Sequence, residues 1–301
     1  MGASRFKLPS PDGFLGRSAR GILSSRKATI AALVCVLLLL AATFGPLLAQ
    51  QNPYDLSAIN LFDARLPPMS PNSNGGIYLL GTDAQGRDML SAMIYGLRTS
   101  LMVGLFAGLV ALALGTALGL VAGYYGGWID ALMMRLVDLM LGFPAILVAL
   151  MLLALLGQGV SKVILALVLV QWAQFARAVR GSALAERNKE YIEAAGSLGL
   201  SDVRIIFGHL LPNCLPPIIV IGTLQVASAI AAEATLSFLG IGLPVTEPSL
   251  GLLIANGYQS LLSGEYWMSV YPGLLLLITV FSINLVGDRL REVLNPRLAE
   301  R

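Results

Sequence analysis

Six stretches of this sequence are long and apolar enough to cross a lipid bilayer, and this feature restricts the fold more than any other. A spanning α-helix needs about 20 largely apolar residues. Because lipid offers the backbone no hydrogen-bond partners, such segments must be helical. We therefore predict an all-α polytopic membrane protein with six transmembrane helices. They fall at about residues 28–48, 100–122, 132–156, 163–178, 216–239 and 268–286.

The composition agrees with a membrane protein. Hydrophobic residues make up 56% of the 301 residues and charged residues 12%, about half the charged fraction of a soluble domain. The first apolar run is too long for a signal peptide and lacks a small-x-small cleavage site, so we interpret it as a membrane anchor. Cys35 and Cys214 lie far apart in apolar segments, which favours buried bystander thiols over a disulfide or a metal site.

The distribution of basic residues predicts the orientation. Most of them fall in the tail 1–27, between the fourth and fifth spans, and after the sixth span. The opposite side carries only Arg65, Arg87, Arg98 and Lys162. Because loops rich in Lys and Arg stay in the cytoplasm, we expect both termini and loop 186–213 to be cytoplasmic. Loop 49–97 is then extracytoplasmic.

Loop 186–213 is polar and has the pattern of two short helices. Residues 189–198 are good helix formers, and Gly196 and Gly199 mark a break before Ser201, a suitable N-cap. Pro212 is expected to end the second helix. The apolar face expected for that helix consists of Val203, Ile206, Phe207 and Leu210.

A second polar motif closes the long loop before the second span. Residues 80–88 read LGTDAQGRD, in which glycine supplies backbone freedom and Asp and Arg can pair across a turn. The alternative is a solvated loop with three unrelated charges.

The spans themselves carry weaker signals. A stripe of small residues on the second span predicts close helix packing: Gly104, Gly108, Ala111, Gly115, Gly119 and Gly123. Pro144 is expected to kink the third span, which suits either a gate or simple packing. Arg135 and Asp138 can pair locally on that span. Glu233 is an intramembrane carboxylate, which either lines a solute path or is locally paired.

These motifs together resemble one family of transporters. The series Glu193, Ala194, Ala195, Gly199, Leu211 and Pro212 resembles the cytoplasmic EAA loop of ABC-importer permeases. Residues Gly81, Thr82, Asp83, Gly86, Arg87 and Asp88 resemble the LGTD-x-x-GRD signature of dipeptide and oligopeptide permeases. Residues 236–242 and the stretch that starts at Asn284 are also similar to that family. His209, Leu250 and Glu292 depart from its usual pattern.

The resemblance implies a C-type permease subunit with five spans in a type I importer core, residues 98–290, preceded by an additional anchor, 28–48. The tails would be 1–27 and 291–301. Its implied partners are a homologous permease, two cytoplasmic ATPases docked on the EAA loop, and an extracytoplasmic solute-binding protein. In that family the Ala pair lets the loop approach the ATPase closely, and the Glu is a polar anchor. The implied location is the bacterial inner membrane.

The sequence also limits what the chain does by itself. It has no Gly-Lys dipeptide and so no Walker A phosphate loop, so ATP and Mg²⁺ are expected on the partner subunits. With one histidine, we expect no catalytic residue, cofactor or metal site here. The resemblance implies a di- or oligopeptide as the solute, with a glutathione-like peptide or a nickel or other metal chelate as the alternatives. The rivals are a secondary transporter or channel, for which we find no internal repeats, and a non-transporting membrane scaffold.

Overall fold

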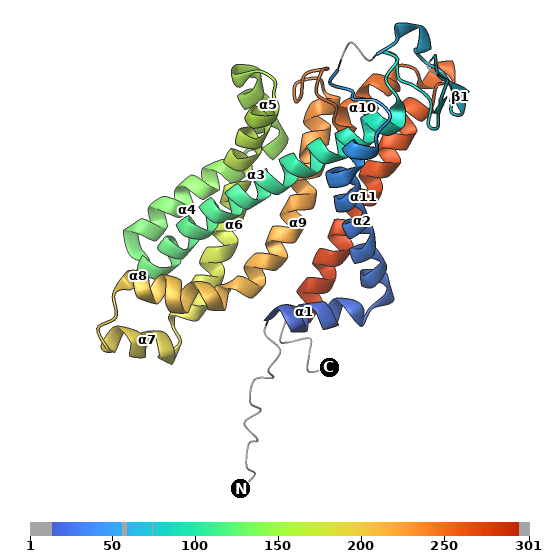
Figure 1. The fold of residues 1–301 in the computed structure, drawn as a ribbon. Coiled ribbons are helices and arrows are strands. Elements are labelled where there is room, and N and C mark those ends of the chain that lie inside the picture. The colour runs from blue at the N-terminus through green and yellow to red at the C-terminus, as the bar shows by residue number, and fades with distance from the viewer. Residues whose placement is uncertain (1–13, 56–58, 74, 295–301) are drawn as a thin grey trace.

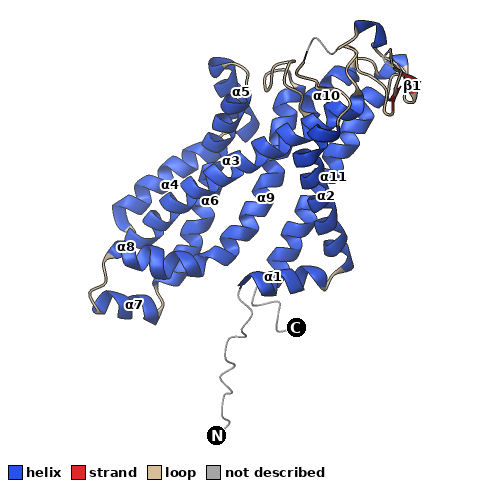
Figure 2. Cartoon of the chain, in the orientation of Figure 1, coloured by secondary structure: helices blue, strands red, loops and turns tan. Residues whose placement is uncertain are grey.

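A computed structural model describes residues 14–294 apart from 56–58 and 74, so the first part of the predicted tail 1–27 and most of the predicted tail 291–301 lie outside the described residues. The described chain is helical except for one small hairpin, β1 (Ser70–Pro71) with β2 (Ile77–Tyr78) (Figures 1 and 2). The helices are α1 (Phe14–Leu23), α2 (Arg26–Leu48), α3 (Met89–Tyr125), α4 (Gly127–Gly142), α5 (Ala145–Leu156), α6 (Val160–Arg187), α7 (Glu190–Ser197), α8 (Asp202–Ile205), α9 (Leu211–Phe238), α10 (Leu250–Tyr258) and α11 (Trp267–Leu294).

The six predicted spans are all present as helices. Five helical segments are long and apolar enough to cross a membrane: α2, α3, α6, the path Asp202–Phe238 that ends with α9, and α11. The sixth is a bent pair, α4 and α5. The all-helical fold class is therefore confirmed.

The third span is broken, not kinked as we expected. Its two halves meet at 87°. Pro144 occupies the N-cap position of α5, and Phe143 before it is extended, with φ −100° and ψ 145°. Since a proline disfavours helical geometry at the residue before it, the chain leaves the helix at this point and starts a new one.

The second span begins well before the predicted boundary. Helix α3 starts at Met89, so residues 89–97 are helical and belong to no loop. The Asp88 side chain caps it by accepting a hydrogen bond from the Ser91 N–H at 2.9 Å. The LGTD-x-x-GRD turn therefore leads directly into the longest helix of the core.

The small-residue stripe on α3 packs as predicted. Gly104 and Gly108 face α9, while Gly115, Gly119 and Gly123 face α6. A Cβ atom added to Gly115 would lie 2.5 Å from the carbonyl oxygen of Trp172. Only glycine lets α3 and α6 approach this closely, so α3 forms the centre of the helix bundle.

Two ion pairs fasten α4 to α6. The Asp130 carboxylate accepts hydrogen bonds from both Nε and Nη2 of Arg180. The Asp138 carboxylate forms an ion pair with Arg177. The predicted local pair of Arg135 with Asp138 is therefore wrong. Helix α6 packs beside α4 and brings Arg177 to Asp138.

The molecule has two distinct ends. Helices α1, α7 and α8 lie at one end in Figure 1, and the β1–β2 hairpin and α10 lie at the other. We call these the α7 end and the hairpin end. Arg289 of α11 donates to the Gly21 carbonyl oxygen at 3.0 Å and so joins α11 to α1 at the α7 end. Residues 14–23 of the tail predicted at 1–27 form this helix, α1.

Candidate functional site

The polar loop 186–213 folds as two short helices with a break, as predicted. Helix α7 is followed by Gly199 at φ +74°, a conformation that glycine adopts without strain. Ser201 stands at the N-cap position of α8 with extended dihedral angles, φ −66° and ψ 148°, but its side chain makes no capping bond. The predicted break is therefore correct in position.

The second helix does not end at Pro212. A π-helical turn, Ile206–Leu210, follows α8 and leads straight into α9. In this turn the Leu211 N–H donates to the carbonyl oxygen of Ile206, five residues earlier, whereas an α-helix pairs residues four apart. Proline has no N–H to donate, and the π turn adjusts the hydrogen-bond pattern just before it. Loop and membrane helix therefore form one continuous helical path.

The buried face of this path differs from the predicted one. Ile206 and Leu210 are buried as expected. Val203 is 65% exposed and Phe207 is 61% exposed. The missing member of the buried face is Ile205, at 3% exposure, which packs with Ile192 and Ala195 of α7.

The Ala pair of the EAA motif is split between two surfaces. Ala195 is 4% exposed and packs α7 against Ile205 of α8, within the same loop. Ala194 and Glu193 are exposed. Leu198, at 81% exposure, is exposed on the same segment. We call the exposed set Glu193, Ala194, Leu198, Val203 and Phe207 the outward residues of the loop.

Three polar contacts anchor the loop to the membrane helices. Tyr124 at the end of α3 donates to Asp202 at 2.9 Å. Tyr191 of α7 donates to Glu186 of α6 at 2.8 Å, and Lys189 reaches the same carboxylate at 2.6 Å. Burial and the hydrogen bond to Glu186 raise the pKa of Tyr191 to about 12, so its hydroxyl remains a donor at neutral pH. The loop is thus held to the bundle from both sides.

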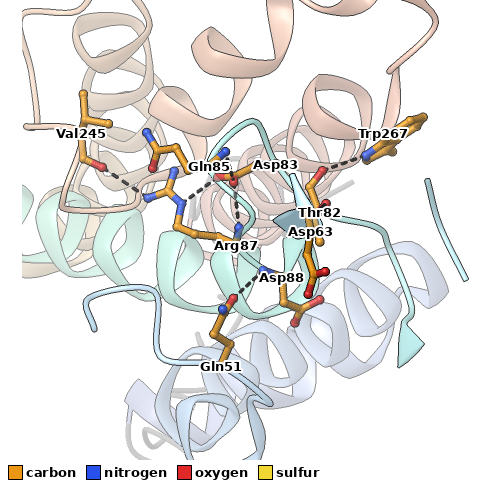
Figure 3. A network of polar contacts seen from close by, with 9 residues as sticks. All are labelled: Gln51, Asp63, Thr82, Asp83, Gln85, Arg87, Asp88, Val245 and Trp267. Carbon is orange, nitrogen blue, oxygen red and sulfur yellow. Dashed lines mark hydrogen bonds and ion pairs between the residues drawn. The ribbon is translucent and has the colours of Figure 1, made fainter. Parts of the chain in front are cut away.

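The turn at residues 80–88 is buried and internally paired (Figure 3). Arg87 and Asp83 are 2% and 4% exposed, and Arg87 Nε donates to Asp83 Oδ2 at 2.7 Å. Asp83 Oδ1 also accepts the N–H groups of Gln85 at 2.8 Å and Arg87 at 3.0 Å. Gly81 and Gly86 have φ values of +79° and +81°. The predicted cross-paired turn is confirmed, and the solvated-loop alternative is wrong.

This turn also connects segments that are distant in the sequence. Arg87 Nη1 donates to the Val245 carbonyl oxygen at 3.3 Å, in the connection between α9 and α10. Trp267 Nε1, at the start of α11, donates to the Thr82 carbonyl oxygen at 3.0 Å. The Asp88 N–H donates to Gln51 Oε1 at 2.6 Å, near the end of α2 (Figure 3). The motif therefore holds the hairpin end together.

The hairpin beside this turn is itself fixed by a buried carboxylate. Asp63 is 7% exposed and accepts the Tyr78 hydroxyl at 2.9 Å. The hydrogen bond from Ser73 holds the pKa of Asp63 below its usual value. Burial, with the bond to Asp63, raises the pKa of Tyr78 to about 12. At neutral pH, then, the carboxylate accepts and the phenol donates, which locks the hairpin to residues 61–63.

Glu233 lies in a closed polar corner where three helices meet. It is fully buried, and its Oε2 and Oε1 accept the hydroxyls of Ser100 on α3 and Ser237 on α9, each at 2.7 Å. Ser100 Oγ in turn accepts the Leu250 N–H at the start of α10, at 3.3 Å. Of the two alternatives for Glu233, a residue that lines a solute path or one that is locally paired, this geometry is that of local pairing. The same hydrogen bonds connect α10 to α3 and α9.

We expect Glu233→Gln to reduce solute uptake several-fold while membrane abundance stays above about half. The amide still fills the corner, but bonds to a neutral acceptor are weaker than bonds to a carboxylate, so α10 is held less firmly. Quantitative immunoblotting and uptake assays measure the two quantities. Glu233→Leu is the control, because it removes both acceptors and should lower abundance as well. Parallel losses in the Gln variant would indicate a packing role alone.

Comparison with known proteins gives a consistent result. Residues 115–300 match the model of a family described as binding-protein-dependent transport system inner membrane component. The dipeptide transport system permease protein of Bacillus subtilis is 38% identical over 277 residues, covering 92% of this chain and 84% of that protein. The oligopeptide transport system permease protein of the same organism is 35% identical, covering 91% and 87%. The di/tripeptide transport system permease protein of Pseudomonas aeruginosa is 37% identical, covering 88% and 86%.

A solved structure shares the fold. The inward-facing MetNI methionine ABC transporter contains a chain that aligns with a TM-score of 0.56 and 21% identity. The alignment covers 68% of this chain and 97% of that one.

Proposed function

The chain belongs to the family of binding-protein-dependent transport system inner membrane components, and from this premise we propose that it forms half of the pathway by which an importer takes up di- or oligopeptides. It is a multi-pass inner-membrane permease of an ABC importer and is not itself an ATPase. The proposal of a peptide solute is supported by relatives whose names include dipeptide, di/tripeptide and oligopeptide transport.

The outward residues of loop 186–213 are the observation that carries the coupling role. Leu198, Val203 and Phe207 are large apolar side chains, more than 60% exposed, that follow α7, lie on α8 and lie in the π turn, respectively. Exposed apolar residues in such a place favour a contact with a protein partner. We propose that this partner is the ATPase, with Glu193 as a polar anchor and Ala194 allowing close approach.

The proposed orientation follows from that contact. ATP is cytoplasmic, so the α7 end faces the cytoplasm, and the hairpin end faces the solute-binding protein on the other side. The positive-inside bias supports the same orientation. The remaining partners would be a homologous permease, because one chain encloses only part of a pathway, and a second ATPase subunit.

The continuous path from α8 into α9 suggests how closure of the ATPases reaches the solute. A displacement of α8 passes through the π turn to α9 without crossing a flexible linker. The other end of α9 carries Glu233, which is bonded to α3 and linked through Ser100 to α10. We propose that ATP-driven movement of the loop rearranges this corner and alternately opens the two ends of the pathway.

Purification of the tagged chain under native conditions, with mass spectrometry of its companions, tests the assembly. We expect a second permease and P-loop ATPases to be recovered with it. Vesicles that contain the complex and its binding protein should accumulate a radiolabelled alanine tripeptide only with ATP. Recovery of this chain in a stable self-assembly alone, or ATP-independent uptake, would contradict the proposal.

A further inference from the structure

Two hollows lie along α9 and meet at Phe238. The first, about 490 Å³, lies between α9 and α11 and is lined by small and apolar side chains such as Ala231, Thr235 and Gly273. The second, about 410 Å³, lies at the hairpin end between α10 and the turn that follows α9. Phe238 lines both.

The hollow at the hairpin end is lined by apolar side chains and by neutral polar groups. The amides of Gln158, Asn256 and Gln259 border it, together with the aromatic rings of Phe238 and Tyr258. Those rings stack edge to face with centroids 5.9 Å apart. None of the described residues that line this hollow is charged.

One of these amides lacks a partner. The Asn256 Nδ2 atom is buried and makes no hydrogen bond to any described residue. A buried amide donor is normally paired, so this one requires an oxygen acceptor from a water molecule or a ligand. By contrast, Gln158 Nε2 already donates to the Gly240 carbonyl oxygen at 2.7 Å. Among the described amides that line this hollow, Asn256 is therefore the one with a buried donor that has no partner.

The chemistry of the lining fits a peptide main chain. Every peptide unit offers one carbonyl oxygen and one N–H whatever its side chain, and side-chain amides can pair with both. Neutral groups bind such a chain weakly enough for it to move on, as a transport pathway requires. A metal chelate rich in carboxylates would instead favour cationic side chains, which this lining does not supply.

We propose that the amide-lined hollow beside α10 is a contact site for the main chain of the transported peptide, with Asn256 Nδ2 donating to a peptide carbonyl oxygen. The inference rests on the proposed function, because it assumes a peptide solute. Glu233 supports the site indirectly, since its corner fixes the start of α10.

Photo-cross-linking in the assembled complex tests the location. Tyr258→p-benzoylphenylalanine places a reactive group at the hollow, where the native side chain is 60% exposed. Tyr54→p-benzoylphenylalanine is the matched control, a tyrosine 47% exposed at the hairpin end that packs against Tyr95 and not in the hollow. With a radiolabelled alanine tripeptide in vesicles, we expect at least about fivefold more label at position 258. Excess unlabelled tripeptide should remove it.

Equal or absent labelling at position 258, in vesicles that do take up the tripeptide, would overturn the contact site and leave the proposed function standing. Failure of the unmodified complex to take up any peptide would overturn the proposed function, and this inference with it.

Uptake kinetics test the role of Asn256. Asn256→Leu keeps the side-chain volume but removes the donor, so we expect the KM for tripeptide uptake to rise about three- to tenfold with an unchanged maximal rate. Gln158→Leu is the comparison, since its amide is already paired with the chain and should affect KM less. An unchanged KM in an Asn256→Leu protein of normal abundance would exclude the proposed hydrogen bond.

Discussion

Glu193→Arg should reduce peptide uptake to below about one tenth of the unmodified value while the protein remains inserted and folded. Glu193 is exposed on α7 and is not part of the buried cluster that contains Ile192 and Ala195, so the change leaves that buried face intact. At a close contact with a partner, a reversed charge costs several kcal/mol. The ATPase subunits should therefore dissociate from the permease during purification.

The matched control is Glu190→Arg. Both glutamates lie in the first turn of α7 and both are exposed, so each change places a cation near the N-terminus of the same helix. We expect the Glu190 variant to keep at least about half of the uptake and to retain its ATPases. Normal uptake in the Glu193 variant would rule out the docking role, and equal losses in both variants would point to a general charge effect.

The sequence predicted the parts of the fold that depend on local pattern. The spans follow from runs of apolar residues, and the glycines on α3 follow from their helical spacing. The paired turn at residues 80–88 was predictable because Asp83 and Arg87 are four residues apart and glycine allows the chain to turn between them. In each case the residues that carry the signal lie close together in the sequence.

The parts that were missed depend on tertiary packing. Val203 and Phe207 have the spacing of a buried face, but in the described chain both are exposed. Helix α10 has nine residues, too few to be noticed as a span. The bonds of the 80–88 turn to Val245 and Trp267 cross more than 150 residues, and no local signal marks either residue. Tyr124 and Asp202 are likewise paired only by the fold.

The largest loss of stability should follow from Arg87→Met. Arg87 is 2% exposed and pairs with Asp83, which is 4% exposed, so the change leaves a buried carboxylate without its partner. Removal of one member of a buried ion pair costs about 3 to 5 kcal/mol. The variant also loses the bond to Val245, which joins the turn to the connection between α9 and α10. We expect the thermal midpoint of the purified protein to fall by on the order of 10 °C.

Two further variants separate the unpaired charge from a simple loss of packing. Arg65→Met is the exposed control in the same loop, since the Arg65 side chain is 54% exposed and lies 3.7 Å from Glu265, and such pairs contribute about 1 kcal/mol or less. Asp83→Asn added to Arg87→Met removes the buried charge but keeps an oxygen for the N–H groups of Gln85 and Arg87. We expect the double variant to recover more than half of the lost stability, because the penalty arises mainly from the unpaired carboxylate. A double variant as unstable as Arg87→Met alone would show that packing and the Val245 bond, and not the charge pair, hold the hairpin end together.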